Sequence, residues 1–114
     1  MAEEQYKDGT LAATGEYVDG LRHGPWTFYF RNGEVQAQGD YRAGELDGEW
    51  TWHRRTGGLL QQGAFVNGRR HGRWRRWHDT GNLLDEGTYA DDKKTGEWVS
   101  YDKAGNETKR RTHR

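Results

Sequence analysis

The chain has 114 residues, of which 31% are hydrophobic and 32% are charged, and its 18 basic and 18 acidic residues give a net charge of zero. A neutral chain has no overall electrostatic attraction to nucleic acid or to an anionic membrane, and the lack of cysteine excludes disulfides and thiolate chemistry. The N-terminus carries no apolar stretch of the kind found in secretory signals, so we expect a cytoplasmic protein.

Four consecutive units of 24 residues share one pattern without insertion or deletion. Such self-similarity is typical of repeat proteins, in which each unit packs mainly on its neighbours. Aromatic residues make up 13% of the chain and follow this period, which argues against disorder. We therefore divide residues 1–114 into a half repeat at 1–14, repeats at 15–38, 39–62, 63–86 and 87–110, and a tail at 111–114, all within one array.

Each repeat contains two turn signals. The first is a G-x-x-x-G segment such as Gly20 to Gly24, and the second is a short turn that ends in glycine, such as Arg31-Asn32-Gly33. The stretches between them are rich in aromatic and β-branched residues and too short for helices. The predicted fold is all-β, a single-layer twisted antiparallel meander of β-hairpin repeats. We expect strands near 3–7, 10–18, 25–31, 34–42, 49–54, 58–66, 73–78, 82–90, 97–102 and 106–110.

Equivalent positions of the repeats form rows across this sheet, and such rows stabilise a sheet by packing between strands. One row holds Trp26, Trp50, Trp74 and Trp98, and a second holds Tyr17, Tyr41, Phe65 and Tyr89. An aliphatic row holds Leu11, Val35, Leu59 and Leu83 and ends in Glu107. Aromatic residues occur on both faces of the strands, so the pattern leaves the identity of the buried face open.

The third repeat concentrates arginine and tryptophan between residues 69 and 78. Both residue types are favoured at protein interfaces, and cations interleaved with aromatic rings also suit nucleic acid. A protein partner is favoured over nucleic acid because the whole chain is neutral, and a solvated patch balanced by nearby acids is the remaining alternative. Strand alternation places Trp74, Arg76 and His78 on one face and Arg73, Arg75 and Trp77 on the other. The candidate partner-binding residues are these six together with Trp50 and Trp52 of the second repeat.

No motif for catalysis or for a cofactor is present. His23 and His71 occupy equivalent positions two repeats apart, a separation of roughly 20 Å that prevents them from sharing a metal. Glu49 and Glu97 are separated in the same way, too far for paired acid–base chemistry. We therefore predict a protein that is not an enzyme and that needs neither a cofactor nor a metal.

The repeat resembles the MORN repeat, and more closely its variant class. The segments that carry the resemblance are Asp19 to Tyr29 and Asn67 to Trp74, which contain D/N-G-x-x-x-G-x-W. His53, Asp92 and Glu107 depart from the pattern, and the last two are expected effects of the array's end.

The resemblance implies a binding role. Short arrays of this variant are grouped with YwqK-like antitoxin or immunity proteins, which implies a protein partner such as a toxin. The alternative is a MORN scaffold or a membrane-peripheral module that contacts phospholipid through Arg73, Arg75 and Arg76. The outer strands leave unpaired backbone groups, so we expect a monomer or an edge-to-edge dimer. The terminal charges that would discourage pairing are Glu3, Glu4, Lys109, Arg110 and Arg111.

Overall fold

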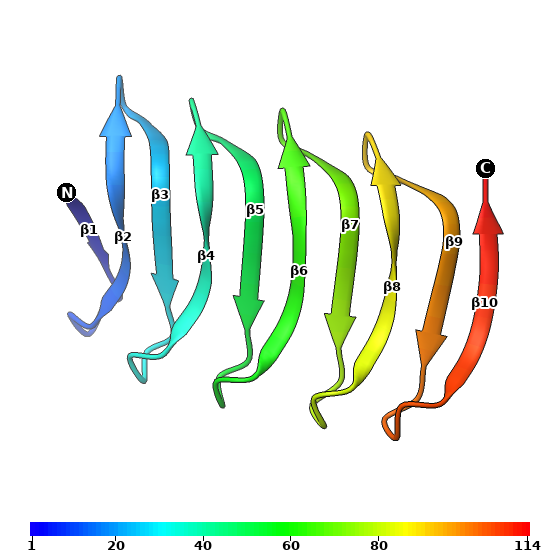
Figure 1. Cartoon of the computed structure of the whole chain (residues 1–114). Coiled ribbons are helices and arrows are strands. Elements are labelled where there is room, and N and C mark those ends of the chain that lie inside the picture. Colours follow the sequence, from blue (N-terminus) through cyan, green and yellow to red (C-terminus); the bar gives the residue numbers. More distant parts are fainter.

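The computed structural model describes residues 1–114 as one sheet of ten antiparallel strands, arranged in the order of the sequence (Figure 1). This confirms the predicted all-β hairpin meander. No helix of the kind that could cross a membrane is present. The strands are β1 (Ala2–Gln5), β2 (Leu11–Val18), β3 (Leu21–Tyr29), β4 (Val35–Arg42), β5 (Glu45–His53), β6 (Leu59–Val66), β7 (Arg69–Trp77), β8 (Leu83–Ala90), β9 (Lys93–Tyr101) and β10 (Glu107–His113).

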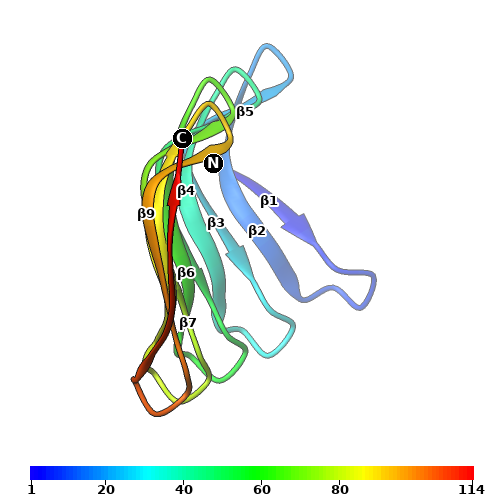
Figure 2. The same cartoon turned by 90° about the vertical axis from the view of Figure 1, so that its right-hand side faces the viewer.

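The sheet is a single curved layer. Its principal extents are 43 × 30 × 17 Å, and Figure 2 shows the strands curving together, with no second layer against them. The N-terminal β1 and the C-terminal β10 lie at opposite edges, where each pairs with one neighbour (Figure 1). Because there is no second layer, each strand can bury side chains only against the strands beside it.

The odd-numbered strands from β3 onward begin earlier than the sequence predicted. The G-x-x-x-G segment is not one turn: a two-residue turn at Asp19 and Gly20, with φ of 53° and 79°, is followed directly by β3 at Leu21 rather than at residue 25. Positive φ at both central residues matches the twist of a tight hairpin. Gly24 lies inside β3 with φ of 73°, where the pairing of β2 with β3 is interrupted. The second glycine of the segment therefore bends a strand instead of closing a turn.

The glycine that opens each repeat is required by the tryptophan of the next strand. A Cβ on Gly15 would lie 2.2 Å from the indole of Trp26, so the ring rests directly on the backbone of β2. The indole Nε1 donates a hydrogen bond to the carbonyl oxygen of Glu16 at 3.1 Å. The same contact joins Gly39 to Trp50, Gly63 to Trp74 and Gly87 to Trp98, and each indole donates to the carbonyl after its glycine.

The tryptophan row is the core of the protein. Trp26 and Trp50 are each 1% exposed, although the sheet has only one layer. Rings of the second row pack edge-on against them: the centroids of Tyr17 and Trp26 lie 5.2 Å apart, as do those of Tyr41 and Trp50. We call the side of the sheet that carries these two rows the aromatic face. The structure thus decides which face is buried, a question the sequence left open.

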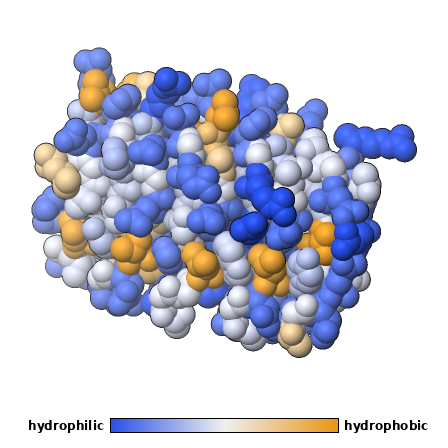
Figure 3. All heavy atoms as spheres, viewed as in Figure 1, coloured by the Kyte–Doolittle hydropathy of each residue, from blue (hydrophilic) through white to orange (hydrophobic).

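The other side of the sheet, the polar face, carries cross-strand polar pairs. Gln62 donates to the Thr51 hydroxyl at 3.0 Å, and Arg73 and Arg75 reach the carboxylate of Glu86 at 3.0 and 3.6 Å. The face of the molecule seen in Figure 1 is largely hydrophilic, with small, separate hydrophobic areas (Figure 3).

Candidate functional site

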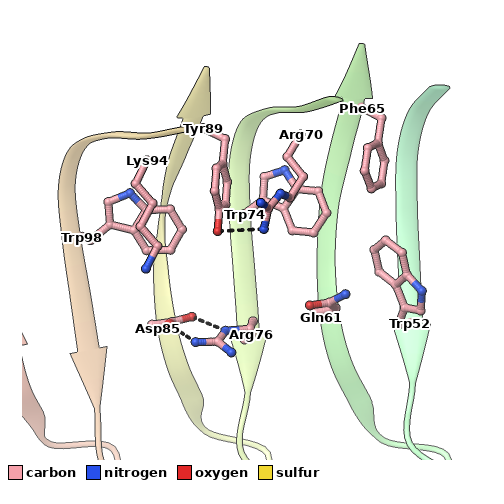
Figure 4. Close-up of a pocket in the computed structure, with 10 residues that line it drawn as sticks. All are labelled: Trp52, Gln61, Phe65, Arg70, Trp74, Arg76, Asp85, Tyr89, Lys94 and Trp98. Atoms are coloured by element: carbon pink, nitrogen blue, oxygen red, sulfur yellow. Dashed lines mark hydrogen bonds and ion pairs between the residues drawn. The ribbon is translucent and has the colours of Figure 1, made fainter. Parts of the chain in front are cut away.

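A hollow of about 360 Å³ lies on the aromatic face across β5 to β9. Figure 4 views it from the side opposite to Figure 1, with β9 on the left and β5 on the right. The lining residues are Trp52, Gln61, Phe65, Arg70, Trp74, Arg76, Asp85, Tyr89, Lys94 and Trp98.

The hollow exists because one aromatic position of the repeat changes along the array. Two residues after the tryptophan, the first repeat has Phe28 and the second has Trp52, and both stack on the tryptophan of their own strand, at 6.0 and 5.7 Å between centroids. The third repeat has Arg76 at this position and the fourth has Ser100. Without an aromatic ring there, a hollow is left beside Trp74 and Trp98, although these two core residues are only 5% and 7% exposed.

Arg76 turns toward the next strand and forms a two-pronged ion pair with Asp85 (Figure 4). Its Nε lies 3.0 Å from Oδ1 and its Nη2 lies 2.6 Å from Oδ2. Asp85 is 6% exposed and occupies the position of Ala13 and Ala37 in the earlier repeats. The hydrogen bonding of the Arg76 guanidinium to the Asp85 carboxylate is the main cause that raises the pKa of Arg76. A permanent cation therefore lies at one end of the hollow, held in a fixed orientation.

Two further cations lie along the edge of the hollow, each against an aromatic ring. The Arg70 guanidinium lies 4.4 Å from the ring centroid of Tyr89, and its Nε is 3.1 Å from Oδ1 of Asp92. The Lys94 ammonium lies 4.6 Å from the ring centroid of Trp98 and forms no salt bridge. Its charge is therefore available to a ligand, and its aliphatic stem covers part of the indole.

A smaller hollow of about 110 Å³ continues the first toward the C-terminal edge. It shares Asp85, Lys94 and Trp98 with the first hollow and adds Ser100 and three residues of β10, which are Lys109, Arg111 and His113. Burial is the main cause that lowers the pKa of His113, with the nearby cations acting in the same direction, so the neutral form of this imidazole is favoured.

The two hollows together are electropositive. Their walls contain five basic side chains but a single carboxylate, that of Asp85. The cations are Arg70, Arg76, Lys94, Lys109 and Arg111. An aromatic floor beneath unbalanced positive charge suits a ligand that combines carboxylates with apolar groups.

The structure brings three of the eight residues expected to bind a partner into the hollow, namely Trp52, Trp74 and Arg76. Trp50 is 1% exposed and lies within the core, beneath Tyr41 and Trp52.

Arg73 and Arg75 lie on the opposite, polar face, where both pair with Glu86. Trp77 and His78 do not line the hollow either. The Trp77 carbonyl accepts a hydrogen bond from Arg54 at 2.8 Å, and the His78 imidazole lies 2.7 Å from the carbonyl oxygen of Tyr101. Both contacts join neighbouring hairpins, so these residues contribute to the stacking of repeats.

Sequence reasoning missed Arg70, Asp85, Lys94 and the residues of β10. A usable signal was present in the alignment of the repeats. Asp85 occupies the position of the alanines 13 and 37, and Arg76 occupies the position of the aromatic residues 28 and 52. These two departures lie opposite each other in the register of β7 with β8. Two coupled departures at paired positions indicate a feature of one repeat rather than random variation.

The comparisons with known proteins agree with the observed architecture. The family described as MORN repeat variant matches residues 22–43 and 70–91. These segments run from β3 into the turn before β5 and from β7 into the turn before β9, equivalent parts of the array that begin in the first and third repeats and end in the second and fourth. No curated protein matches the chain. The two matches and the ten-stranded hairpin meander together support a MORN-repeat protein.

Proposed function

We propose that this chain is a non-enzymatic protein-binding module that holds an acidic segment of a partner protein in the hollow of the aromatic face. The observation that carries the proposal is the excess of cations around exposed aromatic surface at one end of an otherwise neutral array. MORN repeats are a binding or scaffolding kind of module, which is compatible with this role.

The shape of the site favours a peptide segment over a small enclosed ligand. The hollow lies on an open sheet rather than between layers, so it can accept one or two side chains of a larger molecule. Lys94 offers an unpaired ammonium for a carboxylate, while the half-buried Trp52 and Phe65 offer ring surface for an apolar neighbour. A partner with acidic and apolar residues side by side would satisfy both parts of the site.

The finer proposal is that the partner is a cytoplasmic toxin and that the chain acts as its antitoxin or immunity protein. It rests on the resemblance of this repeat to the variant grouped with such proteins. The preformed hollow supports it, because a rigid site binds an exposed loop without losing much of its own conformational entropy.

A membrane-peripheral role is less well supported by the geometry. Arg73, Arg75 and Arg76 do not share one surface, because the first two lie on the polar face and the third lies in the hollow. Each of the three also has a carboxylate neighbour, in Glu86 or Asp85. We therefore retain the protein partner as the proposal.

Two charge-matched variants test the proposed site. Arg70→Gln/Lys94→Gln removes two positive charges from the hollow, and Arg73→Gln/Arg75→Gln removes two from the polar face. The protein to test is the product of the gene beside the one that encodes this chain. Its affinity is measured by calorimetry, and its toxicity by growth of cells that co-express the two proteins.

We expect the hollow variant to lose at least about tenfold in affinity and to fail to restore growth, while the polar-face variant behaves as the unmodified chain. Equal loss in both variants would reject the hollow as the binding site. A neighbouring protein that binds through the hollow without being toxic would retain the binding module and reject the antitoxin role.

A further inference from the structure

The two outer strands of the sheet are unlike each other in charge. Within residues 1–114, β1 and β10 each pair on one side only, so each presents a free row of backbone donors and acceptors. β1 carries Glu3 and Glu4, whereas β10 carries Lys109, Arg110 and Arg111. One open edge of the array is therefore acidic and the other is basic.

The two edges are also complementary parts of one repeat. β1 pairs with β2 as Ala2 with Gly15, the register in which Trp26 pairs with Gly39, so β1 is the second half of an odd-numbered strand. β10 pairs with β9 as Arg111 with Trp98, which is the register of an even-numbered strand. Within residues 1–114, the open side of β10 is therefore one that an odd-numbered strand would fit, and the open side of β1 is one that an even-numbered strand would fit.

The strand register inside the array predicts which residues of β10 and β1 would lie opposite each other in such a junction. Where β2 meets β3, Ala13 lies opposite Phe28 and Thr14 lies opposite Thr27, and the later repeats keep these pairings. Moved along by the 24-residue period, the same pairings set Lys109 opposite Glu4 and Arg110 opposite Glu3 of a second copy. Both pairs join opposite charges directly across the strands, which stabilises antiparallel pairing.

Side-chain size is matched at the neighbouring position as well. Inside the array, a glycine such as Gly15 must lie beneath the tryptophan of the following strand. At the junction the equivalent residues are Arg111 and Ala2. The large residue is therefore Arg111 on the even-numbered strand, and the small residue is Ala2 on the odd-numbered strand. No indole faces Arg111 across this junction, so its side chain is not excluded.

The charges that would meet are partly unpaired within one copy. Glu3 and Lys109 form no salt bridge, while Glu4 pairs with Arg22 at 2.9 Å and Arg110 pairs with Glu97 and Glu107. Like edges repel each other, so pairing between two β1 edges or between two β10 edges is disfavoured.

From these observations we propose that copies of this chain join head to tail, with β10 of one copy pairing with β1 of the next so that the meander continues. A head-to-tail contact of this kind builds linear assemblies rather than closed dimers.

Reversal of the edge charges tests this assembly: Glu3 and Glu4 lie outside both hollows, whereas Lys109 also lines the smaller one. One variant, Glu3→Lys/Glu4→Lys, has two basic edges, and the other, Lys109→Glu/Arg110→Glu, has two acidic edges. Sedimentation velocity at low salt is expected to show assemblies of the unmodified chain that grow with concentration and dissociate at high salt. Each variant alone should remain at the monomer mass of 13.3 kDa, and an equimolar mixture should assemble again. Glu3→Lys and Lys109→Glu, which alter residues without internal partners, repeat the test with little risk to the fold.

The register is tested separately by a disulfide, because the chain has no cysteine of its own. Glu4→Cys/Lys109→Cys places the two thiols opposite each other in the proposed junction, whereas Glu4→Cys/His113→Cys offsets them by four residues along β10. Mild oxidation is expected to give a ladder of covalent oligomers from the first variant and only monomer from the second. An unmodified chain that stays monomeric at every concentration, a variant mixture that does not assemble, or equal ladders from both cysteine variants would overturn the proposal.

Discussion

The first half of the aromatic face is closely packed, whereas the second half, built from the same repeat, contains a hollow. In the first half, Phe28 and Trp52 stack on their tryptophans, and Ala37 lies between them in the sheet. In the second half, Arg76 and Asp85 occupy the equivalent positions and leave a hollow of about 360 Å³. The backbone register is the same in both halves, so side chains at a few positions decide whether the face is packed or open.

This difference shows how a repeat protein can gain a site without changing its fold. The contacts that define the repeat, such as Gly63 beneath Trp74, are kept in the second half. The altered positions lie beside this core rather than within it. A function can therefore be added to one repeat at small cost to the rest of the array, because each unit contacts mainly its neighbours.

The largest effect is expected from removing a tryptophan in the packed half. Trp50→Ala should lower the free energy of unfolding by about 3–5 kcal/mol, because the indole is 1% exposed and its ring packs against those of Phe28, Tyr41 and Trp52. Trp98→Ala should cost less, because Trp98 lies beside the hollow and water can occupy part of the space left. Urea unfolding measures both, and equal losses would contradict the contrast between the halves.

An intermediate effect is expected from making the open half resemble the packed half. Arg76→Phe alone should destabilise the protein by about 1–3 kcal/mol, because it leaves the buried carboxylate of Asp85 without its partner. Arg76→Phe/Asp85→Ala recreates the pairing of Phe28 with Ala37 and should be at least as stable as the unmodified chain.

Urea unfolding of the two variants distinguishes the effect of the added ring on packing from the effect of the lost ion pair on the free energy of unfolding. If the double variant is no more stable than the single one, a ring does not fit at position 76. The double variant should also fail to bind an acidic partner, since it removes the fixed cation of the site.

The smallest effect concerns the two-residue turn between β8 and β9. Gly44 and Gly68 occupy the second position of the equivalent earlier turns, but this turn has Asp92, whose carboxylate accepts hydrogen bonds from the backbone N and the Nε of Arg70. The backbone hydrogen bond is the main cause that lowers the pKa of Asp92 below its ordinary value of 3.8. Its contribution to stability is therefore present above that value and is lost as the pH falls through the lowered pKa.

Asp92→Asn should remove this part of the acid sensitivity. Melting temperatures at neutral pH and at about pH 2 are expected to differ less in the variant than in the unmodified chain. An unchanged difference would mean that the carboxylate of Asp92 contributes no stability that depends on its charge.

The sequence predicted the fold well but the site only in part. The period and the turn residues sufficed for the ten-stranded meander, because glycine and aspartate at fixed intervals admit few other structures. The beginnings of the odd-numbered strands were wrong because Gly24 resembles a turn residue, although it lies within a bent strand. The prediction of a binding site between Arg73 and His78 included Arg76, which lines the hollow. It also included Arg73 on the polar face and His78 in the connection after β7, neither of which lines the hollow.

By itself the sequence determined the repeat, the hairpins and the two aromatic rows, since these follow from local conformational preference and a fixed period. The tertiary structure alone decided that the tryptophan row is buried against glycine backbone and that Asp85 lies opposite Arg76. It also placed Lys94 and Arg111 beside the same hollow. The physical reason is that the register and the bulges between strands determine which residues lie opposite each other across a sheet. The spacing of residues along one strand does not determine that register.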